Sequence, residues 1–418
     1  MVMMGLSLTD TLPFDTVFLH AMVRDKTGKK MSKSLGNVID PIDVIEGITL
    51  EDLNKQLYLG NLSPHAIEKA IKLQAFQFPQ GIPECGTDAL RFTLLNFSTP
   101  QGRDINLDVY RVNGYRMFCN KLWNATKFAL QNLTGFEWTN DELPNIDDLG
   151  FTDKWILSRL NHMIKESNEA IAVYDFQRYT TAAYEFFLKE LCDVYLEMIK
   201  PVMNLDVSSE ENAKRKRASQ LVLFTCLEQG FRILHPAMPF LTEELWQRLP
   251  GINKLPKSRE SIMVNTYPKP VDAWANAQIE TEMEYVNEII HHIRSAKAAY
   301  QLTFKQKPDV YVKSTSQSHA DLIIRQSAEI EGLACSGKLI LAGSEPIPQG
   351  CAVEIVDKAT ELHIVLKGMI DFNVEIEKQK KNMTKLQQAY DNLIKKMNLP
   401  SYKEKVPERV QIDDLAKA

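Results

Sequence analysis

Helical periodicity over residues 109–250 is the feature that most limits how this chain can fold. In the stretch from Val109, apolar residues recur close to the spacing of one helix face, at Val112, Tyr115, Cys119, Leu122, Trp123 and Leu130. The segments 152–174, 176–200 and 211–249 repeat the pattern, and the polar loop NLDVSSEEN separates the last two. Amphipathic helices of this length bury one face against each other. The sequence therefore predicts an antiparallel helical bundle.

The first part of the chain carries a different pattern, of short apolar runs separated by turn residues. The runs MVMMGLSL and TVFLHAMV predict strands of a buried, parallel sheet. The first run has no basic flank and no cleavage site, so we interpret it as a buried strand and not as a signal peptide. Because the chain opens in such a strand, we expect that other strands and helices of the sheet are missing from this sequence.

A polar, glycine-flanked loop rich in lysine, residues 24–36, follows the second apolar run. Asp40 and Pro41 predict the start of a helix, since aspartate is a good N-cap residue and proline suits the first helical position. Residues 47–87 show poor periodicity, and a further helix is expected after Thr87. The order of strand, loop and helix places the loop beside the predicted sheet.

The last part of the chain predicts a small domain and then a single long helix. Residues 276–300 are helical in pattern, and residues 309–366 alternate four strand-like runs with a helix near 317–330, which indicates an α/β or α+β domain. Residues at the two seam positions of a heptad repeat then follow: Ile376, Met383, Tyr390 and Met397 at one, and Gln379, Leu386 and Leu393 at the other. This seam predicts a coiled coil of about three heptads, which needs a partner helix.

Composition excludes several classes of protein. With a formal net charge of -5 over 418 residues, bulk charge does not hold the chain on nucleic acid, and any RNA contact must use local basic patches. The six cysteines include no CxxC pair and the eight histidines no HExxH pair, so we expect no disulfide scaffold and no protein-bound metal. Scattered reduced thiols are typical of a cytoplasmic protein. No apolar stretch approaches the ~20 residues of a membrane span.

The strongest chemical signal is the motif Lys30-Met31-Ser32-Lys33-Ser34 (KMSKS), which is followed by Leu35-Gly36-Asn37. Most short lysine runs are solvated surface loops, and that alternative explains the charge of the segment. It does not explain the order of the residues or their position between a strand and a helix. We therefore interpret the motif as functional.

The motif resembles the signature of class I aminoacyl-tRNA synthetases, and the wider string FLHAMVRDKTGKKMSKSLGNVIDPIDVI resembles their valine, isoleucine and leucine group. Four further strings resemble the valyl-tRNA synthetases in particular: IPECGTDALRF, GRDINLDVYRVNGYRMFCNKLWNATKFAL, HPAMPFLTEELWQRLP and SIMVNTYPKP. The resemblance covers almost the whole chain, and its sub-type is similar to the eukaryotic cytosolic enzymes.

This resemblance implies a mostly α fold in four parts. Residues 1–108 would be a remnant of the Rossmann-type α/β catalytic domain, with the KMSKS loop and a stem-contact region. Residues 109–275 would form the helical anticodon-binding domain, residues 276–372 a small α/β junction domain, and residues 373–418 a truncated, tRNA-binding coiled-coil arm.

The resemblance also implies ATP-dependent activation of valine and its transfer to tRNA-Val. Lys33 and Lys30 would be catalytic, and Lys30, Met31, Ser32, Lys33 and Ser34 would bind ATP, which arrives with Mg²⁺. Gly28 and Gly36 would let the loop close on ATP and reopen. His20 is left open between a place at the ATP site and a buried, hydrogen-bonded position.

Candidate tRNA contacts lie on the polar face of the helix that begins at Val109: Arg111, Arg116, Lys121 and Lys127. Such side chains would contact phosphate and carry no base specificity, and a solvated helix face is the alternative. We expect Trp123 and Trp155 in the core. The basic run of residues 214–217 is interpreted as the first turns of a helix near RNA.

The sequence lacks the His-x-Gly-His element, the first class I signature. We therefore predict that the isolated chain does not activate valine, and a non-catalytic tRNA-binding module stays open as an alternative to the ligase. A coiled-coil interaction protein is the third reading. A cytoplasmic location is expected, and membership of a larger synthetase complex is left open.

Overall fold

The computed structural model describes most of the chain: residues 1–32, 35–99, 102, 104–138, 142–254, 256, 259–343, 346–398, 402, 406–407 and 410–411. Lys33 and Ser34, two of the predicted site residues, lie outside these ranges. The chain divides into two compact units, Met1–Met283 and Glu284–Ala418. Each unit is described by itself.

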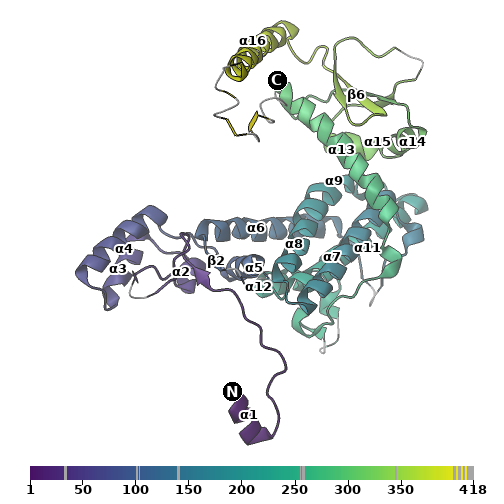
Figure 1. The fold of residues 1–418 in the computed structure, drawn as a ribbon. Coiled ribbons are helices and arrows are strands. Elements are labelled where there is room, and N and C mark those ends of the chain that lie inside the picture. The colour runs from purple at the N-terminus through teal and green to yellow at the C-terminus, as the bar shows by residue number, and fades with distance from the viewer. Residues whose placement is uncertain are drawn as a thin grey trace. The chain divides into compact units, whose positions relative to one another are not determined.

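The first unit is mainly helical (Figure 1). Its α-helices are α1 (Val2–Thr9), α2 (Pro41–Glu46), α3 (Leu50–Gln56), α4 (Pro64–Gln77), α5 (Thr87–Phe97), α6 (Val109–Asn132), α7 (Phe151–Ala172), α8 (Phe176–Glu185), α9 (Leu196–Met198), α10 (Lys200–Met203), α11 (Glu210–Leu234) and α12 (Pro239–Gln247). A π-helical segment, η4 (Phe186–Tyr195), continues α8, and two short strands are β1 (Val23–Arg24) and β2 (Ile105–Asn106). The helix α13 (Ala277–Ala299) runs across the boundary of the two units.

The strands predicted at the start of the chain are wrong. The run MVMMGLSL forms the helix α1, in which no residue is buried, and most of TVFLHAMV has no regular structure. Of the second run only its last residue, Val23, belongs to a strand, β1, which pairs in parallel with β2. A strand leaves its backbone donors and acceptors to a neighbour, whereas a helix pairs them within itself. No described strand lies beside residues 2–9, so the apolar run forms a helix with exposed side chains.

The helix predicted at Asp40 is confirmed. The Asp40 side chain accepts a hydrogen bond from the backbone N–H of Ile42 at 2.9 Å. The poor periodicity of residues 47–87 proved misleading, because this stretch holds α3 and α4. Each of these helices has a side-chain cap, Thr49 on the N–H of Asp52 and Ser63 on the N–H of Ala66. The capping residues were therefore a better signal than the spacing of apolar residues.

The predicted helical bundle is confirmed (Figure 1). Helix α7 packs against both α8 and α11, and the predicted segment 211–249 divides into α11 and α12 where Pro236 and Pro239 interrupt it. In the core, the rings of Phe187 and Phe231 stack at 5.8 Å between centroids. Gly230 makes room for this stack, because a Cβ atom there would lie 2.7 Å from Phe187 Cζ.

The second unit contains the predicted small α/β domain. Its strands are β3 (Val310–Ser314), β4 (Leu339–Leu341), β5 (Cys351–Ile355) and β6 (Thr360–Val365), in the order β4-β3-β6-β5. Strands β3 and β4 are parallel and are joined through two helices, α14 (Gln317–Arg325) and α15 (Ser327–Ala334), where one had been predicted. Strand β6 is antiparallel to both of its neighbours.

The long helix predicted near the end of the chain is α16 (Phe372–Met397). Four side chains of the predicted seam are exposed: Ile376, Met383, Leu386 and Tyr390. Nothing in the described part of the chain covers them, and the coiled coil stays a prediction. Across the described residues, none of the helices has the length and apolar character that crossing a membrane requires.

Candidate functional site

The KMSKS loop begins on a buried aspartate at the end of β1. Asp25 is 1% exposed, and its Oδ1 accepts hydrogen bonds from the backbone N–H of Thr27 at 3.0 Å, from the Thr27 hydroxyl at 2.7 Å and from the N–H of Lys29 at 2.9 Å. Gly28, at the tip of this turn, has a φ of 80°, in the left-handed region that favours glycine. The first half of the loop is therefore a tight turn wrapped around one carboxylate.

Asn37 fastens the far end of the loop to the same aspartate. Its Nδ2 donates to Asp25 Oδ2 at 2.9 Å and to the carbonyl oxygen of Lys30 at 3.3 Å. Its Oδ1 accepts from the backbone N–H of Ser32 at 3.0 Å. Asn37 therefore holds the backbone on both sides of Met31.

The pKa of Asp25 reflects these contacts. Burial raises it, but the hydrogen bonds from Asn37, Thr27 and Lys29 outweigh burial and bring the pKa below its ordinary value. Asp25 is therefore a carboxylate at neutral pH. Sequence reasoning missed both Asp25 and Asn37. An aspartate two residues before a threonine is an Asx-turn pattern that could have indicated the first of them.

The cations around the loop differ in their partners. Arg24 is paired with Asp104, and Lys26 Nζ lies 3.0 Å from Asp108 Oδ2. Lys29 and Lys30 are exposed, and within the described ranges neither makes an ion pair. Lys30 is thus an available ammonium group on a loop whose backbone is held. No placement is described for Lys33, the other predicted catalytic lysine.

The remaining predicted residues of this site are partly exposed. Met31 and Ser32 are half-buried, while His20 is exposed and its Nδ1 lies 2.8 Å from the carbonyl oxygen of Ala21. The buried alternative for His20 is therefore wrong. Gly36 is buried with a φ of 65°, and a Cβ atom there would lie 2.9 Å from Ala70 Cβ, so the end of the loop packs closely on α4.

The four predicted tRNA-contact residues of α6 are not equivalent. The guanidinium of Arg111 lies 4.4 Å from the ring centroid of Phe97, and Arg116 reaches Glu84 at 4.0 Å. Lys121 Nζ lies 3.0 Å from Asp193 Oδ1, a contact that raises the pKa of Lys121. Lys127 is exposed and has no ion pair among the described residues. Of the four, Lys127 is the most accessible to a phosphate.

Two further predictions about this region have different outcomes. Trp155 is buried, as predicted, but Trp123 is 41% exposed and the guanidinium of Arg248 lies 5.3 Å from its ring centroid. Arg248 directly follows α12, and its contact with the ring at the surface is one that periodicity along α6 could not reveal. In the basic run, the guanidinium of Arg217 lies 4.0 Å from the ring centroid of Phe136.

A buried carboxylate joins α5 to α12. Asp88 accepts hydrogen bonds from the backbone N–H groups of Phe240, at 3.3 Å, and Leu241, at 2.6 Å. Arg91 adds a second tie, because it donates to the carbonyl oxygen of Pro236 at 2.9 Å. The strings IPECGTDALRF and HPAMPFLTEELWQRLP, far apart in the sequence, therefore meet at one helix end.

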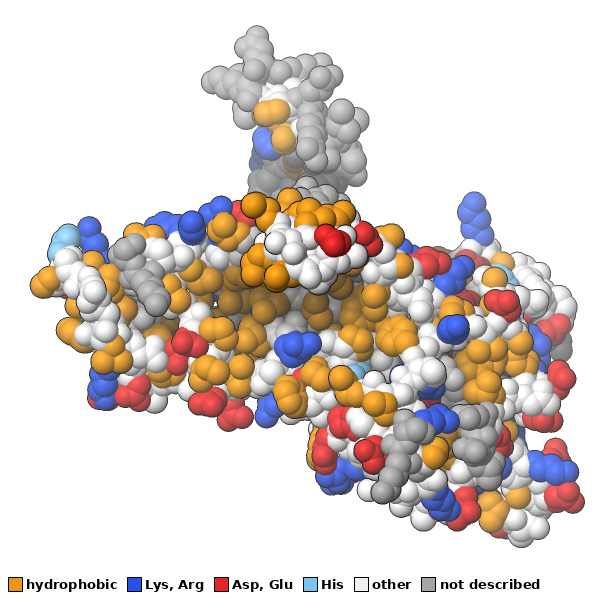
Figure 2. Space-filling view, turned by 90° about the horizontal axis from the view of Figure 1, so that it is seen from below, with side chains coloured by type: hydrophobic (Ala, Val, Ile, Leu, Met, Phe, Trp, Pro, Cys, Tyr) orange, Lys and Arg blue, Asp and Glu red, His pale blue; other side chains and the backbone are white. Residues whose placement is uncertain are grey.

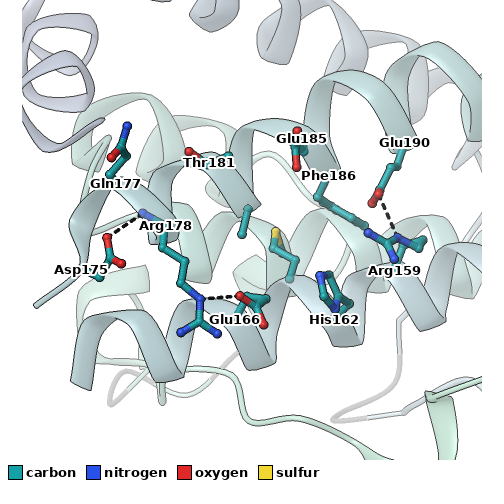
Figure 3. A pocket seen from close by; sticks show the side chains of 12 residues that line it. Arg159, His162, Glu166, Asp175, Gln177, Arg178, Thr181, Glu185, Phe186 and Glu190 are labelled. Atoms are coloured by element: carbon teal, nitrogen blue, oxygen red, sulfur yellow. Dashed lines mark hydrogen bonds and ion pairs between the residues drawn. The ribbon is translucent and has the colours of Figure 1, made fainter. Parts of the chain in front are cut away.

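The bundle also contains a charged cavity of about 390 Å³ between α7 and the α8–η4 segment (Figure 3). At one end Arg159 Nε lies 2.8 Å from Glu190 Oε1, and at the other Arg178 Nε lies 2.5 Å from Glu166 Oε2. His162 lies between them, and burial lowers its pKa. Both arginines are already paired, so the cavity offers no free cation from either.

A second cavity, of about 490 Å³, is apolar and is lined by Leu94, Leu95, Phe176, Tyr179 and other residues of the bundle. Figure 2 shows hydrophobic side chains gathered around a hollow on one face of the molecule. Two further cavities lie along α11. None of these four is lined by residues 24–37, and the described residues hold no cluster of His, Cys, Asp and Glu that could bind a metal ion.

Two family models match the chain. The model of class I tRNA synthetases for isoleucine, leucine, methionine and valine matches residues 1–108. The model of the anticodon-binding domain of tRNA ligases matches residues 153–312. The first range contains the KMSKS loop, and the second contains α8, α11 and all but the first two residues of α7.

Curated relatives match along the chain. It is 46% identical to a valine–tRNA ligase of Mus musculus over 100% of this chain and 32% of that protein. A valine–tRNA ligase of Caenorhabditis elegans is 41% identical over 100% of this chain and 40% of its own length. A mitochondrial valine–tRNA ligase of Saccharomyces cerevisiae is 38% identical over 97% of this chain and 36% of its own length. The chain thus spans about a third of the length of these relatives.

Among solved structures, a leucyl-tRNA synthetase in complex with tRNA, from Agrobacterium radiobacter, aligns with 66% of this chain and 27% of its own, at 19% identity and a TM-score of 0.42. A similarity of this size does not establish a common fold. The family models and the alignment with relatives along the chain are independent of it. The chain belongs to the class I aminoacyl-tRNA synthetases, and within that family it aligns over its whole length with valine–tRNA ligases.

Proposed function

We propose that this chain is the part of a valine–tRNA ligase that contacts the polyphosphate of ATP and binds tRNA-Val. In this reaction the valine carboxylate attacks the α-phosphate of ATP, and pyrophosphate leaves. The valyl group then passes from AMP to a hydroxyl group of the tRNA, and AMP is released. Alignment with valine–tRNA ligases along the chain supports the reaction, and the KMSKS loop supports the position of the chemistry.

The observation that carries the proposal is an exposed Lys30 on a held backbone. Negative charge builds on the β- and γ-phosphates as the bond to the α-phosphate breaks, so a positioned ammonium group stabilises the transition state. Arg24 and Lys26 are paired with carboxylates, which leaves Lys29 and Lys30 as the described cations of the loop without ion pairs. Lys33 would supply the second catalytic ammonium group, and Ser32 and Ser34 would donate hydrogen bonds to phosphate oxygens.

Magnesium would enter with ATP as part of the substrate complex. The described residues of the loop suit a polyphosphate and not a bare metal ion, because the one carboxylate within it, Asp25, is buried and already accepts four hydrogen bonds. Bound Mg²⁺ would neutralise part of the phosphate charge. The chain's own contribution is its ammonium groups and the backbone that holds them.

The tRNA would be bound by the helical parts of the chain. Lys127 of α6 makes no ion pair with any described residue, and α16 exposes Lys380, Lys381, Lys385, Lys395 and Lys396. Lysines neutralise backbone phosphates without reading sequence, so they would add affinity and salt dependence. Arg111, Arg116 and Lys121 would contribute where their present partners are displaced by phosphate. We propose that the protein acts in the cytosol and can join larger synthetase complexes.

The test uses an enzyme of the relatives' length that carries this chain. Lys33→Ala is expected to lower the rate constant of valine-dependent ATP–pyrophosphate exchange far more than it weakens valine binding, because the ammonium group acts on the leaving pyrophosphate. Unchanged exchange in that variant would remove Lys33 from the mechanism. The isolated chain is expected to show no exchange.

A second candidate function is a non-catalytic tRNA-binding module. It is favoured by the exposed lysines of α6 and α16, which suit phosphate binding whether or not the chain takes part in catalysis. Filter binding shows whether the isolated chain binds tRNA-Val, which both candidate functions require. Binding of tRNA-Val by the isolated chain, without exchange activity in any longer enzyme that carries it, would favour the module over the ligase.

A further inference from the structure

We infer that Asp25 and Asn37 act as a pair of positioning residues for the activation step, holding the loop backbone that carries Lys30. The inference rests on the proposed function, since it assigns a task to two residues beside the same loop. Neither residue need touch ATP. Their contribution would come through the position of the Lys30 ammonium group.

The pair is connected to the loop on every side. One carboxylate oxygen of Asp25 accepts hydrogen bonds from the N–H groups of Thr27 and Lys29, and the other accepts from the side-chain amide of Asn37. Asn37 in turn donates to the carbonyl oxygen of Lys30 and accepts from the N–H of Ser32. The backbone is thus held at Lys29, at Lys30 and at Ser32.

The two residue types suit these contacts and cannot simply be exchanged one at a time. Every group that meets Asp25 is a donor, so the position requires an acceptor without N–H groups, which an ionised carboxylate is. Asn37 must donate and accept at once, which an amide does and a carboxylate does not. The burial of Asp25, at 1% exposed, makes an unsatisfied donor there costly.

The free side chain of Lys30 supports a catalytic purpose for this arrangement. A loop that only needed to fold could pair its lysines, as Lys26 pairs with Asp108 at 3.0 Å. Lys30 instead makes no ion pair in the described part of the chain, while its carbonyl oxygen accepts a hydrogen bond from Asn37. The backbone is fixed and the ammonium group is left available, which is the arrangement that lowers the cost of placing a charge in a transition state.

The experiment exchanges the two functional groups in an enzyme of the relatives' length that carries this chain. In Asp25→Asn, an amide N–H₂ group faces the N–H₂ group of Asn37, so their hydrogen bond is lost. In Asn37→Asp, two carboxylates face each other and the same hydrogen bond is lost. The double variant Asp25→Asn with Asn37→Asp restores one donor and one acceptor between the two positions, but it replaces the hydrogen bond to the Lys30 carbonyl with an oxygen that cannot donate. Asp40→Asn is the matched control, because Asp40 is an exposed N-cap a few residues away and asparagine caps equally well.

For each single variant we expect the kcat of valine-dependent ATP–pyrophosphate exchange to fall about 100-fold, the size of effect that a small misplacement of a catalytic group produces. The KM for valine and the affinity for tRNA-Val should stay near those of the unaltered enzyme, while the melting temperature falls somewhat because a buried polar group loses its partner. The double variant should recover a large part of kcat, and Asp40→Asn should match the unaltered enzyme.

The outcomes separate the two levels of the proposal. If the unaltered enzyme shows no valine-dependent exchange, the proposed function fails. If that enzyme is active and the single variants keep its kcat, the positioning role is overturned. It is also overturned if the single variants lose stability and tRNA binding in step with activity and the double variant does not recover, since the pair would then be merely structural.

Discussion

Asp88 caps the N-terminus of α12 through the backbone N–H of Leu241, at 2.6 Å. Helix α12 starts at Pro239, and the side chain of its N-cap residue, Met238, makes no capping hydrogen bond. The free N–H groups of the first turn therefore take a carboxylate from α5 instead. This contact fastens the segment that follows the KMSKS loop to the helical bundle.

The first prediction concerns this cap. Asp88→Ala should lower the free energy of unfolding by about 1–2 kcal/mol, the usual cost of losing a helix cap. Asp272→Ala is the control, because Asp272 is exposed and makes no side-chain hydrogen bond among the described residues. Urea unfolding followed by circular dichroism measures both variants. Equal stabilities for the two would show that the cap contributes nothing.

The second prediction concerns close packing in the bundle. Gly230→Ala should destabilise the protein by about 1–3 kcal/mol, because its new methyl group would press on the ring of Phe187. Gly114→Ala, in α6, has no neighbouring atom within 4 Å and should instead stabilise by up to about 1 kcal/mol through helix propensity. Opposite shifts in melting temperature are expected, and a gain in both variants would contradict the packing argument.

The third prediction concerns pH. Asp153 is buried, with Tyr195 and Ser219 as its hydrogen-bond donors, and burial raises its pKa despite those bonds. A raised carboxyl pKa means that the folded state binds the proton more tightly than the unfolded state does. Its contribution to stability therefore falls as the pH rises from the unfolded pKa, about 4, towards the raised value.

Asp153→Asn should remove this dependence. The difference in unfolding free energy between the variant and the unaltered chain should move in favour of the variant as the pH rises above about 4. Chemical unfolding at a series of pH values measures it. A difference that is constant with pH would mean that Asp153 keeps an ordinary pKa in the folded protein.

The fourth prediction concerns RNA binding, and it rests on the proposed function. Lys127→Ala should weaken binding of tRNA-Val and lower the slope of log affinity against log salt concentration by about 1, the loss of one phosphate contact. Lys189→Ala is the control, since Lys189 is held by Glu185 at 2.8 Å on α8 and η4. Filter binding across a salt series measures both. An unchanged slope for Lys127→Ala would place α6 away from phosphate.

Local signals in the sequence determined a large part of the fold. The cap at Asp40, the periodicity of α6, α7 and α11 and the alternation of β3 to β6 are set by neighbouring residues, and the structure confirms each of these elements. The KMSKS motif indicated a functional loop, and Lys30 within it is exposed. Backbone propensity and the spacing of apolar residues act over one or two turns, so one sequence suffices to read them.

Contacts between distant residues decided the rest. Only the tertiary structure shows that Asp88 caps a helix more than a hundred positions later. It also shows that the guanidinium of Arg248 lies over the ring of Trp123. The apolar run MVMMGLSL predicted a strand, but a strand requires a neighbour, and none is described beside it. Hydrogen-bond partners and burial belong to pairs of segments, and a pattern along one segment does not contain its partner.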